Sequence, residues 1–226
     1  MLNFKKTGLL AVLLLVPVFV FLFLRYFGKN KYTVPRYVPV QVDSVQTDNG
    51  YRYDTVFHKV PDFSLTNFDG KQVSQKNLEG AVYVADFFFA TCTTICPKMT
   101  TQMGRVQELY KNNPAVKLVS YTVNPAQDSV SVLKAFAEEY DAVPGKWFML
   151  TGPKKEIYEL ARTGYFLPVA DGDGGVDDFI HSPKLVLVDP NKNIRGFYDG
   201  TDPKDVDRLI TEVRIVLHEF NLGTKQ

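Results

Sequence analysis

Cysteine and histidine are both rare in this chain, which has two cysteines and three histidines in 226 residues. Two cysteines exclude a disulfide-rich scaffold, and a chain of this length buries an adequate core without such crosslinks. A charge imbalance is also lacking, because 26 basic residues nearly balance 25 acidic ones. A near-neutral chain has no basic surface of the kind that attracts nucleic acids, so no nucleic-acid partner is expected.

One long apolar run stands near the amino terminus, from Gly8 to Leu24, with lysines before it and Arg25 directly after it. A cleaved signal sequence would have a shorter apolar core, about 7 to 15 residues, followed by a small-residue cleavage site. We therefore predict an uncleaved, single-pass transmembrane anchor at residues 8–27, behind a short N-terminal segment at 1–7. Basic residues flank the run on both sides, so charge alone does not decide its orientation.

Residues 28–52 contain prolines and polar spacers, which predicts an extended tether. Residues 53–226 are then expected to form one folded domain. Near the start of that domain, apolar and polar residues alternate around the turn Asn67–Gly70, and this pattern predicts an N-terminal β-hairpin extension.

The rest of the domain alternates between strand and helix patterns. The nearly continuous apolar run at 81–89 is typical of a central strand that is covered on both faces. Further strands are predicted at 116–123, 147–150, 185–189 and 194–200, and helices at 97–112, 128–140, 154–162 and from 203 onward. This order predicts an α/β, thioredoxin-like sandwich with a mixed central sheet.

Both cysteines, Cys92 and Cys96, lie immediately after the run at 81–89 and before Pro97. Side chains four residues apart can converge on one point, and the carboxyl end of a strand is where open α/β sheets place their sites. A helix that begins at Pro97 should direct its positive end toward Cys96 and lower the pKa of that thiol. Metal binding or thiol exchange is therefore favoured over the alternatives, which are two inert buried cysteines or a structural disulfide.

Among the three histidines, His181 is the candidate for a third ligand. It ends a long loop just before a strand, whereas His58 in the hairpin region and His218 on the last helix are expected to have no special role. Two thiolates and one imidazole form a soft, three-coordinate set, which suits Cu(I) better than zinc, since zinc normally needs a fourth protein ligand or a water molecule.

Four stretches of the sequence resemble the Sco/SenC family of membrane-tethered, thioredoxin-like copper chaperones for cytochrome c oxidase assembly. They are VPDFSLTNFDGKQVS, FFFATCTTICPKM, YTVNPAQDSVSVLKAFAEEY and DDFIHSPKLVLVDPNKNIRGFYDG, within roughly residues 57 to 220. The resemblance implies that Cys92, Cys96 and His181 bind copper, as Cu(I) or in addition as Cu(II). It also implies delivery of copper to the dinuclear copper centre of cytochrome c oxidase subunit II, by a domain that faces the periplasm from the inner (cytoplasmic) membrane.

A second function stays open, because one dithiol can serve two chemistries. In a thiol-disulfide oxidoreductase, Cys92 would attack a partner disulfide and Cys96 would resolve the mixed disulfide, so that the pair forms a redox-active disulfide. The partners would then be other thiol-disulfide or copper-carrier proteins. A metallochaperone is expected rather than an enzyme.

Two features of the sequence set it apart within this resemblance. Thr93 and Thr94 stand between the cysteines, where members usually carry Pro-Asp. Pro183 stands where thioredoxin-like folds place a cis-proline, so the bond between Ser182 and Pro183 is predicted to be cis.

Overall fold

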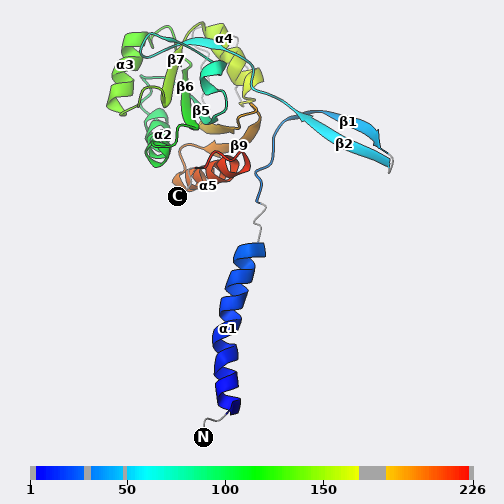
Figure 1. Ribbon diagram of the computed structural model, residues 1–226. Helices are drawn as coiled ribbons and strands as arrows, with labels where there is room; N and C mark the ends of the chain where they lie inside the picture. Colours follow the sequence, from blue (N-terminus) through cyan, green and yellow to red (C-terminus); the bar gives the residue numbers. More distant parts are fainter. Residues whose placement is uncertain (1–3, 28–31, 48–49, 168–181, 224–226) are drawn as a thin grey trace. The chain divides into compact units, whose positions relative to one another are not determined.

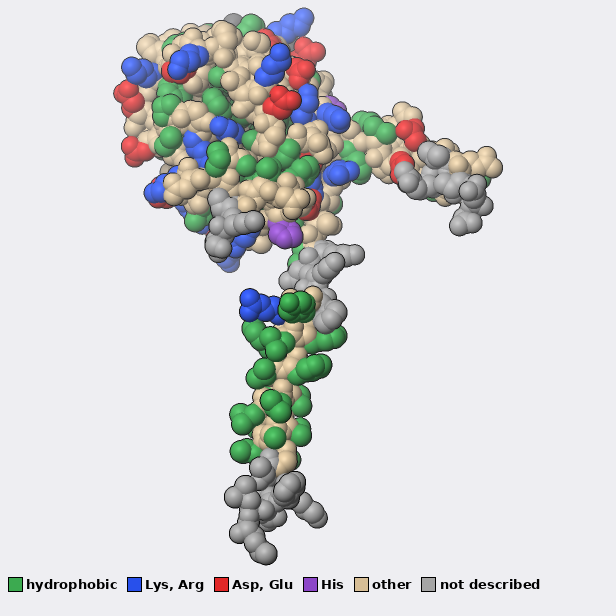
Figure 2. Space-filling model, viewed as in Figure 1, with side chains coloured by type: hydrophobic (Ala, Val, Ile, Leu, Met, Phe, Trp, Pro, Cys, Tyr) green, Lys and Arg blue, Asp and Glu red, His purple; other side chains and the backbone are tan. Residues whose placement is uncertain are grey.

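The computed structural model describes residues 4–27, 32–47, 50–167 and 182–223 (Figure 1). The chain divides into two compact units, Met1–Thr33 and Val34–Gln226. Helix α1 (Phe4–Phe27) belongs to the first unit, and its stretch Gly8–Tyr26 is long and apolar enough to cross a membrane. Figure 2 shows hydrophobic side chains along the apolar run of this helix, and they are exposed. The predicted helix is therefore confirmed, and its surface is of the kind that lipid accommodates.

The second unit begins with a two-stranded antiparallel hairpin, formed by β1 (Pro39–Thr47) and β2 (Gly50–Phe57). Much of this segment was expected to be an extended tether, and that part of the expectation is wrong. The prolines did not prevent strand formation, because Pro39 is the first residue of β1, a position that needs no backbone N–H for the ladder. The hairpin pairs only with itself, since no other strand of the described chain joins its sheet.

Residues before this hairpin are tied to the rest of the unit by a buried ion-pair network. The guanidinium of Arg195 donates hydrogen bonds to the carbonyl oxygens of Val34 and Pro35, and the backbone N–H of Val34 donates to Glu219 Oε1 at 2.8 Å. Arg195 also pairs with Asp189 at 3.1 Å and with Glu219 at 2.6 Å. Removing one member would leave a buried charge without its partner, so these contacts attach the segment firmly to the domain.

The main sheet has seven strands in the order β4-β3-β7-β6-β5-β8-β9. Their bounds are β3 (Ser64–Asn67), β4 (Gln72–Ser74), β5 (Val82–Phe88), β6 (Val116–Thr122), β7 (Trp147–Thr151), β8 (Lys184–Val188) and β9 (Ile194–Asp199). Strands β5, β6 and β7 are parallel, whereas β3, β4, β8 and β9 pair in antiparallel fashion. The predicted mixed sheet and the hairpin around Asn67–Gly70 are therefore confirmed.

Helices cover both faces of this sheet (Figure 1). One core contains residues of α2 (Cys96–Tyr110), α3 (Val130–Glu139) and α5 (Pro203–Glu219). The other contains residues of α4 (Lys154–Glu159) and of two short elements, the 3₁₀ helix η1 (Gln75–Leu78) and the π-helical turn η2 (Leu160–Gly164). Every residue of β5 is buried between these two layers.

Two local expectations differ from the structure. The helix predicted at 154–162 continues as a π turn, because the N–H of Tyr165 bonds to the carbonyl of Leu160, five residues back, at 2.9 Å. No cis peptide bond occurs among the described residues, so the bond between Ser182 and Pro183 is trans and that prediction is wrong. The carbonyl of Pro183 accepts a hydrogen bond from the N–H of Gly200 at 2.7 Å, which continues the pairing of β8 with β9 beyond Lys184.

Candidate functional site

The two cysteines lie in a tight corner between β5 and α2, here called the cysteine corner (residues 89–96). The corner begins with a turn in which the N–H of Cys92 bonds to the carbonyl of Phe89 at 3.2 Å. Helix α2 then begins at Cys96, with Pro97 in its first turn, where the missing N–H costs nothing. Both thiols are free and buried, with 8% of Cys92 and 4% of Cys96 exposed. The expected position at the carboxyl end of a central strand is confirmed.

The two thiols differ strongly in acidity. Burial, the largest influence, raises the pKa of Cys92, but hydrogen bonds from the thiol and backbone N–H of Cys96 and from the hydroxyl and N–H of Thr94 lower it to about 7. The Cys92 sulfur lies 3.6 Å from the Thr94 hydroxyl. For Cys96, burial, the hydrogen bond that it gives to Cys92 and the negative charges of Cys92 and Asp86 raise the pKa to about 12. Near pH 7 about half of the pairs have therefore lost one proton, and above pH 7 the pair holds one shared proton, with the negative charge on Cys92.

This order of acidity is the reverse of what the sequence suggested. The helix that begins beside Cys96 was expected to lower the pKa of that thiol, and this expectation is wrong. The N–H groups of Thr94, before the helix, and of Cys96, at its start, point back to Cys92, so the earlier cysteine receives the hydrogen bonds that stabilise a thiolate. Thr94, one of the residues that replace the usual Pro-Asp, lowers the pKa of Cys92, an effect that the sequence did not predict.

A buried carboxylate, Asp128, holds the cysteine corner to the neighbouring strand. Its Oδ2 accepts hydrogen bonds from the backbone N–H of Ala90 at 3.1 Å and from the hydroxyl of Thr122. The N–H of Val123 also donates to the carbonyl of Phe88 at 2.8 Å, which fixes the end of β5. The sequence marked Asp128 only as the start of a helix, and nothing in its pattern indicated a contact 38 residues upstream.

A second buried carboxylate, Asp86, lies within β5 with only 1% of the residue exposed. The hydroxyl of Ser120 donates to its Oδ1 at 2.5 Å, and the indole of Trp147 donates in turn to the Ser120 oxygen at 2.9 Å. Its Oδ2 has no hydrogen-bond partner within the described ranges. Burial raises the pKa of Asp86 to about 7, and the Ser120 bond opposes that rise. The carboxyl is therefore half-ionised near neutral pH, and its charge acts on Cys96.

The third predicted ligand, His181, lies outside the described residues. Within the ranges that the structure describes, no three His, Cys, Asp or Glu side chains form a group that could hold a metal ion. Strand β8 begins at Lys184 and is antiparallel to β5, with Val186 opposite Ala85. The chain that follows His181 therefore enters β8 at the end of the sheet where β5 finishes and the cysteine corner begins.

His58, which the sequence left without a special role, has a structural one. Its Nε2 lies 3.0 Å from the carbonyl oxygen of Gly164, and its ring packs edge-on against Phe166. His218 lies in the last turn of α5.

Comparison with known proteins gives relatives over most of the chain. The sequence model of the SCO1/SenC family matches residues 52–218. The SCO1 protein homolog of Bacillus subtilis (strain 168) is 36% identical over 163 residues, which are 71% of this chain and 84% of that protein. Identity at this level over most of both chains reflects common descent.

Solved structures agree with this match. A SCO1/SenC family lipoprotein from Bacillus anthracis str. Ames is 31% identical, with a TM-score of 0.62 over 70% of this chain and 94% of that one. BsSco, a Sco family cytochrome c oxidase assembly protein with a disulfide switch, is 35% identical, with a TM-score of 0.59 over 70% and 93% of the two chains. Arabidopsis thaliana ScoI with copper bound is 27% identical, with a TM-score of 0.56 over 70% and 99%. The chain belongs to the SCO1/SenC family and has its thioredoxin-like fold.

Proposed function

We propose that this chain binds copper through Cys92, Cys96 and His181 and acts in cytochrome c oxidase assembly. The observation that carries this proposal is the pair of adjacent free thiols, one of which ionises near neutral pH. Thiolate is the form of cysteine that binds metals, and soft sulfur ligands suit Cu(I). A relative of the same fold has been solved with copper bound, which supports the same cargo here.

The role of His181 rests on the strand topology. Ser182, the residue after His181, leads into β8 at the end of the sheet where the two cysteines lie, which supports His181 as the third ligand. Two thiolates and one Cu(I) ion together carry one net negative charge. A neutral imidazole completes the ligand set without changing that charge.

The acceptor of the copper is proposed to be the dinuclear centre of cytochrome c oxidase subunit II. Helix α1 supports a single-pass anchor, which would keep the domain beside a membrane-bound oxidase. The proposed location is the inner membrane with the domain in the periplasm.

A second function, thiol-disulfide exchange, is favoured by the unequal acidity of the two cysteines. The Cys92 thiolate would attack a partner disulfide, which breaks that bond and releases one partner thiolate as a mixed disulfide forms. Cys96 would then lose its proton and attack the Cys92 sulfur, releasing the second partner thiolate. The partner gains two electrons, and Cys92 and Cys96 end as a disulfide.

An anaerobic Cu(I) titration of the reduced full chain in detergent tests the copper site. The wild type should bind about one copper ion per chain, and Cys92→Ser should abolish this binding. Because loss of a ligand's outer partner alone costs about 10- to 100-fold in metal affinity, His181→Ala should weaken binding at least as much.

Two comparisons keep the roles apart. His218→Ala, the matched control, should bind copper like the wild type. His181→Ala should still reduce a model disulfide at the wild-type rate, because exchange needs only the two sulfurs. Unchanged copper affinity in His181→Ala would remove that residue from the ligand set, and equal loss of both activities would contradict the separation of roles.

A further inference from the structure

The hairpin of β1 and β2 exposes apolar side chains that the rest of the described chain does not cover. Neither strand joins the seven-stranded sheet. A two-stranded hairpin alone is only marginally stable in water, and it needs a further layer against which one face can pack. Its large side chains are instead open to solvent, with 60% of Val42, 64% of Tyr51 and 68% of Tyr53 exposed. The hairpin is therefore a surface that is suited to contact something outside the chain.

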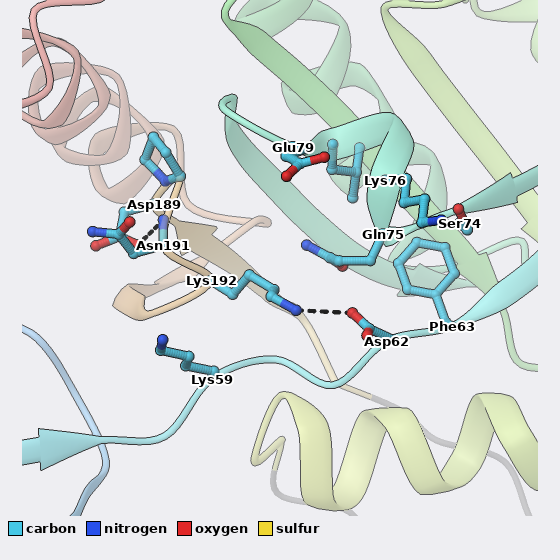
Figure 3. A pocket seen from close by; sticks show the side chains of 12 residues that line it. Lys59, Asp62, Phe63, Ser74, Gln75, Lys76, Glu79, Asp189, Asn191 and Lys192 are labelled. Carbon is cyan, nitrogen blue, oxygen red and sulfur yellow. Dashed lines mark hydrogen bonds and ion pairs between the residues drawn. The ribbon is translucent and has the colours of Figure 1, made fainter.

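The base of the hairpin is fastened to the domain. On the β1 side the N–H of Tyr37 donates to the carbonyl of Ile194 at 2.9 Å. On the β2 side the N–H of Val60 donates to the carbonyl of Lys192 at 2.9 Å. Figure 3 shows Asp62, on the chain that follows β2, facing Lys192, and the two pair at 2.8 Å. Both ends of the hairpin are therefore held, although its strands pair only with each other in the described chain.

The two faces of the hairpin differ in charge. Residues that lie opposite each other on paired strands point to the same face. On one face, here called the neutral face, the pairs are Val42 with Thr55, Ser44 with Tyr53, and Gln46 with Tyr51. None of these six side chains carries a charge. The opposite face has two carboxylates directly across from each other, Asp43 and Asp54. The neutral face is therefore the one that can leave bulk water at low cost.

The composition of the neutral face suits the boundary between lipid and water. Tyrosine is typical of this boundary, because its ring is apolar while its hydroxyl can still bond to water or to headgroups. The other polar side chains of the face, Ser44, Gln46 and Thr55, can find hydrogen-bond partners in the same layer. A dry protein interface would leave some of these groups unpaired, which is costly.

The size of the neutral face also argues against a protein as the main partner. Strand β1 has nine residues, so the face is about 30 Å long, and two strands make it about 10 Å wide. It therefore offers about 300 Å², whereas a specific protein–protein interface buries about 800 Å² on each partner. A lipid surface does not need that area when the chain is already anchored in it.

A short connection keeps the hairpin within reach of lipid. Val34 is held to the domain through Arg195 and Glu219. Only residues 28–33 lie between Val34 and the end of α1, and an extended chain covers at most about 3.6 Å per residue, so Val34 stays within about 25 Å of Phe27. A tether of this length gives an effective concentration of about 1 mM, so even a weak contact with lipid is populated.

We propose that the neutral face of the hairpin binds the lipid surface of the membrane in which α1 is anchored. The rings of Tyr51 and Tyr53 lie at the boundary between headgroups and acyl chains, with Val42 beside them, while Asp43 and Asp54 remain in water. This second contact restricts the rotation of the domain about its tether. The proposal rests on the proposed anchoring by α1 and does not depend on the copper site.

Quenching of tryptophan fluorescence by brominated lipids tests this contact on the full chain, reconstituted in phosphatidylcholine vesicles. The reporter is Tyr53→Trp, which keeps an aromatic ring on the neutral face. Its emission should shift to shorter wavelength and lose intensity in the brominated vesicles. Lipids brominated near the glycerol end should quench it more than lipids brominated near the chain end, because interfacial side chains enter only about 5 to 10 Å below the headgroups.

Matched variants show whether the neutral face makes the contact. The wild type has Trp147 alone, which is fully buried, and should not be quenched. Val56→Trp, on the opposite face, should be quenched less than Tyr53→Trp. Added to Tyr53→Trp, Val42→Asp should abolish the quenching, because a carboxylate would have to leave water. Gln41→Asp adds the same charge to the opposite face and should leave the quenching unchanged.

Flotation with the vesicles separates the hairpin contact from the anchor itself. Every variant should float, since α1 is unchanged, and a chain that does not float would overturn the anchor and the hairpin contact together. In floating chains, an unquenched Tyr53→Trp or equal quenching of Tyr53→Trp and Val56→Trp overturns the hairpin contact alone. Emission of Tyr53→Trp that is shielded from water but not quenched also overturns it, because another protein chain then covers the face. Hydrogen exchange of the β1 and β2 amides checks that the hairpin stays formed in each variant.

Discussion

Replacing Asp86 with asparagine should change how the stability of the domain depends on pH. Burial raises the pKa of this carboxyl from its ordinary 3.8 to about 7 in the folded protein. Below pH 3.8 both the folded and the unfolded chain hold the proton. As the pH rises toward 7, the unfolded chain releases it while the folded chain keeps it, so the folded state loses stability throughout this window. Above pH 7 both states are ionised and the loss stops growing.

The size of this loss follows from the two pKa values. Each tenfold difference in proton affinity corresponds to about 1.4 kcal/mol. The pKa difference between 3.8 and about 7 therefore lowers the free energy of unfolding by about 4 kcal/mol at high pH. About 2.5 kcal/mol of this loss develops between pH 5 and pH 8.

Asparagine removes the titration but keeps an oxygen that can accept the hydrogen bond from Ser120. Its amide N–H₂ would take the place of Oδ2, which has no partner in the described chain, at a pH-independent cost of about 1 to 3 kcal/mol. Because the wild type has already lost about 1.5 kcal/mol by pH 5, Asp86→Asn should differ from it in stability by no more than about 1.5 kcal/mol at that pH. Between pH 5 and pH 8 the free energy of unfolding of the variant should rise by about 2.5 kcal/mol relative to that of the wild type.

Urea unfolding of the full chain in mild detergent, followed by Trp147 fluorescence at pH 5, 6, 7 and 8, measures this difference. The indole of Trp147 bonds to Ser120, so the probe reports on the same cluster. Ser120→Ala is an informative control, because it removes the bond that holds the pKa of Asp86 down, and the loss of stability should then extend to higher pH. A constant difference between wild type and Asp86→Asn across the four pH values would refute the argument.

Two further predictions concern the thiols. Thr94→Val removes one of the hydrogen bonds to Cys92 and should raise the pKa of that thiol from about 7 to about 8, measured from the pH dependence of its alkylation, with Thr93→Val as the matched control. Cu(I) affinity, measured against a competing chelator, should rise about tenfold per pH unit between pH 7.5 and 9, because Cys96 must release a proton on binding. Below pH 6.5 the affinity should rise at least about a hundredfold per pH unit, since Cys92 is then also protonated. A Cu(I) affinity that does not change with pH would contradict the release of protons from these thiols on binding.

The sequence predicted the elements around the cysteines well, because strong local signals mark them. A nearly continuous apolar run specifies the buried strand β5, and Pro97 is favoured in the first turn of a helix. The order of strands and helices then limits the fold to a small set of α/β arrangements. These signals act within a few residues of chain, which is the range that a single sequence reveals.

The features that the sequence did not reveal depend on contacts across the fold. The acidity of Cys92 is set by the path of the corner, which turns the N–H groups of Thr94 and Cys96 toward its sulfur. Asp128 reaches the N–H of Ala90 only because β6 lies beside β5. The hairpin of β1 and β2 was missed for a different reason, since its strands pair only with each other and leave apolar side chains such as Val42 and Tyr53 exposed.

The proton shared by the two cysteines links copper binding to disulfide exchange, the two chemistries proposed for this site, and decides which must come first. Copper binding and disulfide formation both require Cys96 to give up its proton, and each removes the thiolate that the other needs. A pair oxidised to a disulfide has no thiolate for Cu(I), and a pair that holds Cu(I) has no free sulfur for attack. Reduction must therefore come before copper loading, and a partner that oxidises Cys92 and Cys96 also prevents the chain from carrying copper.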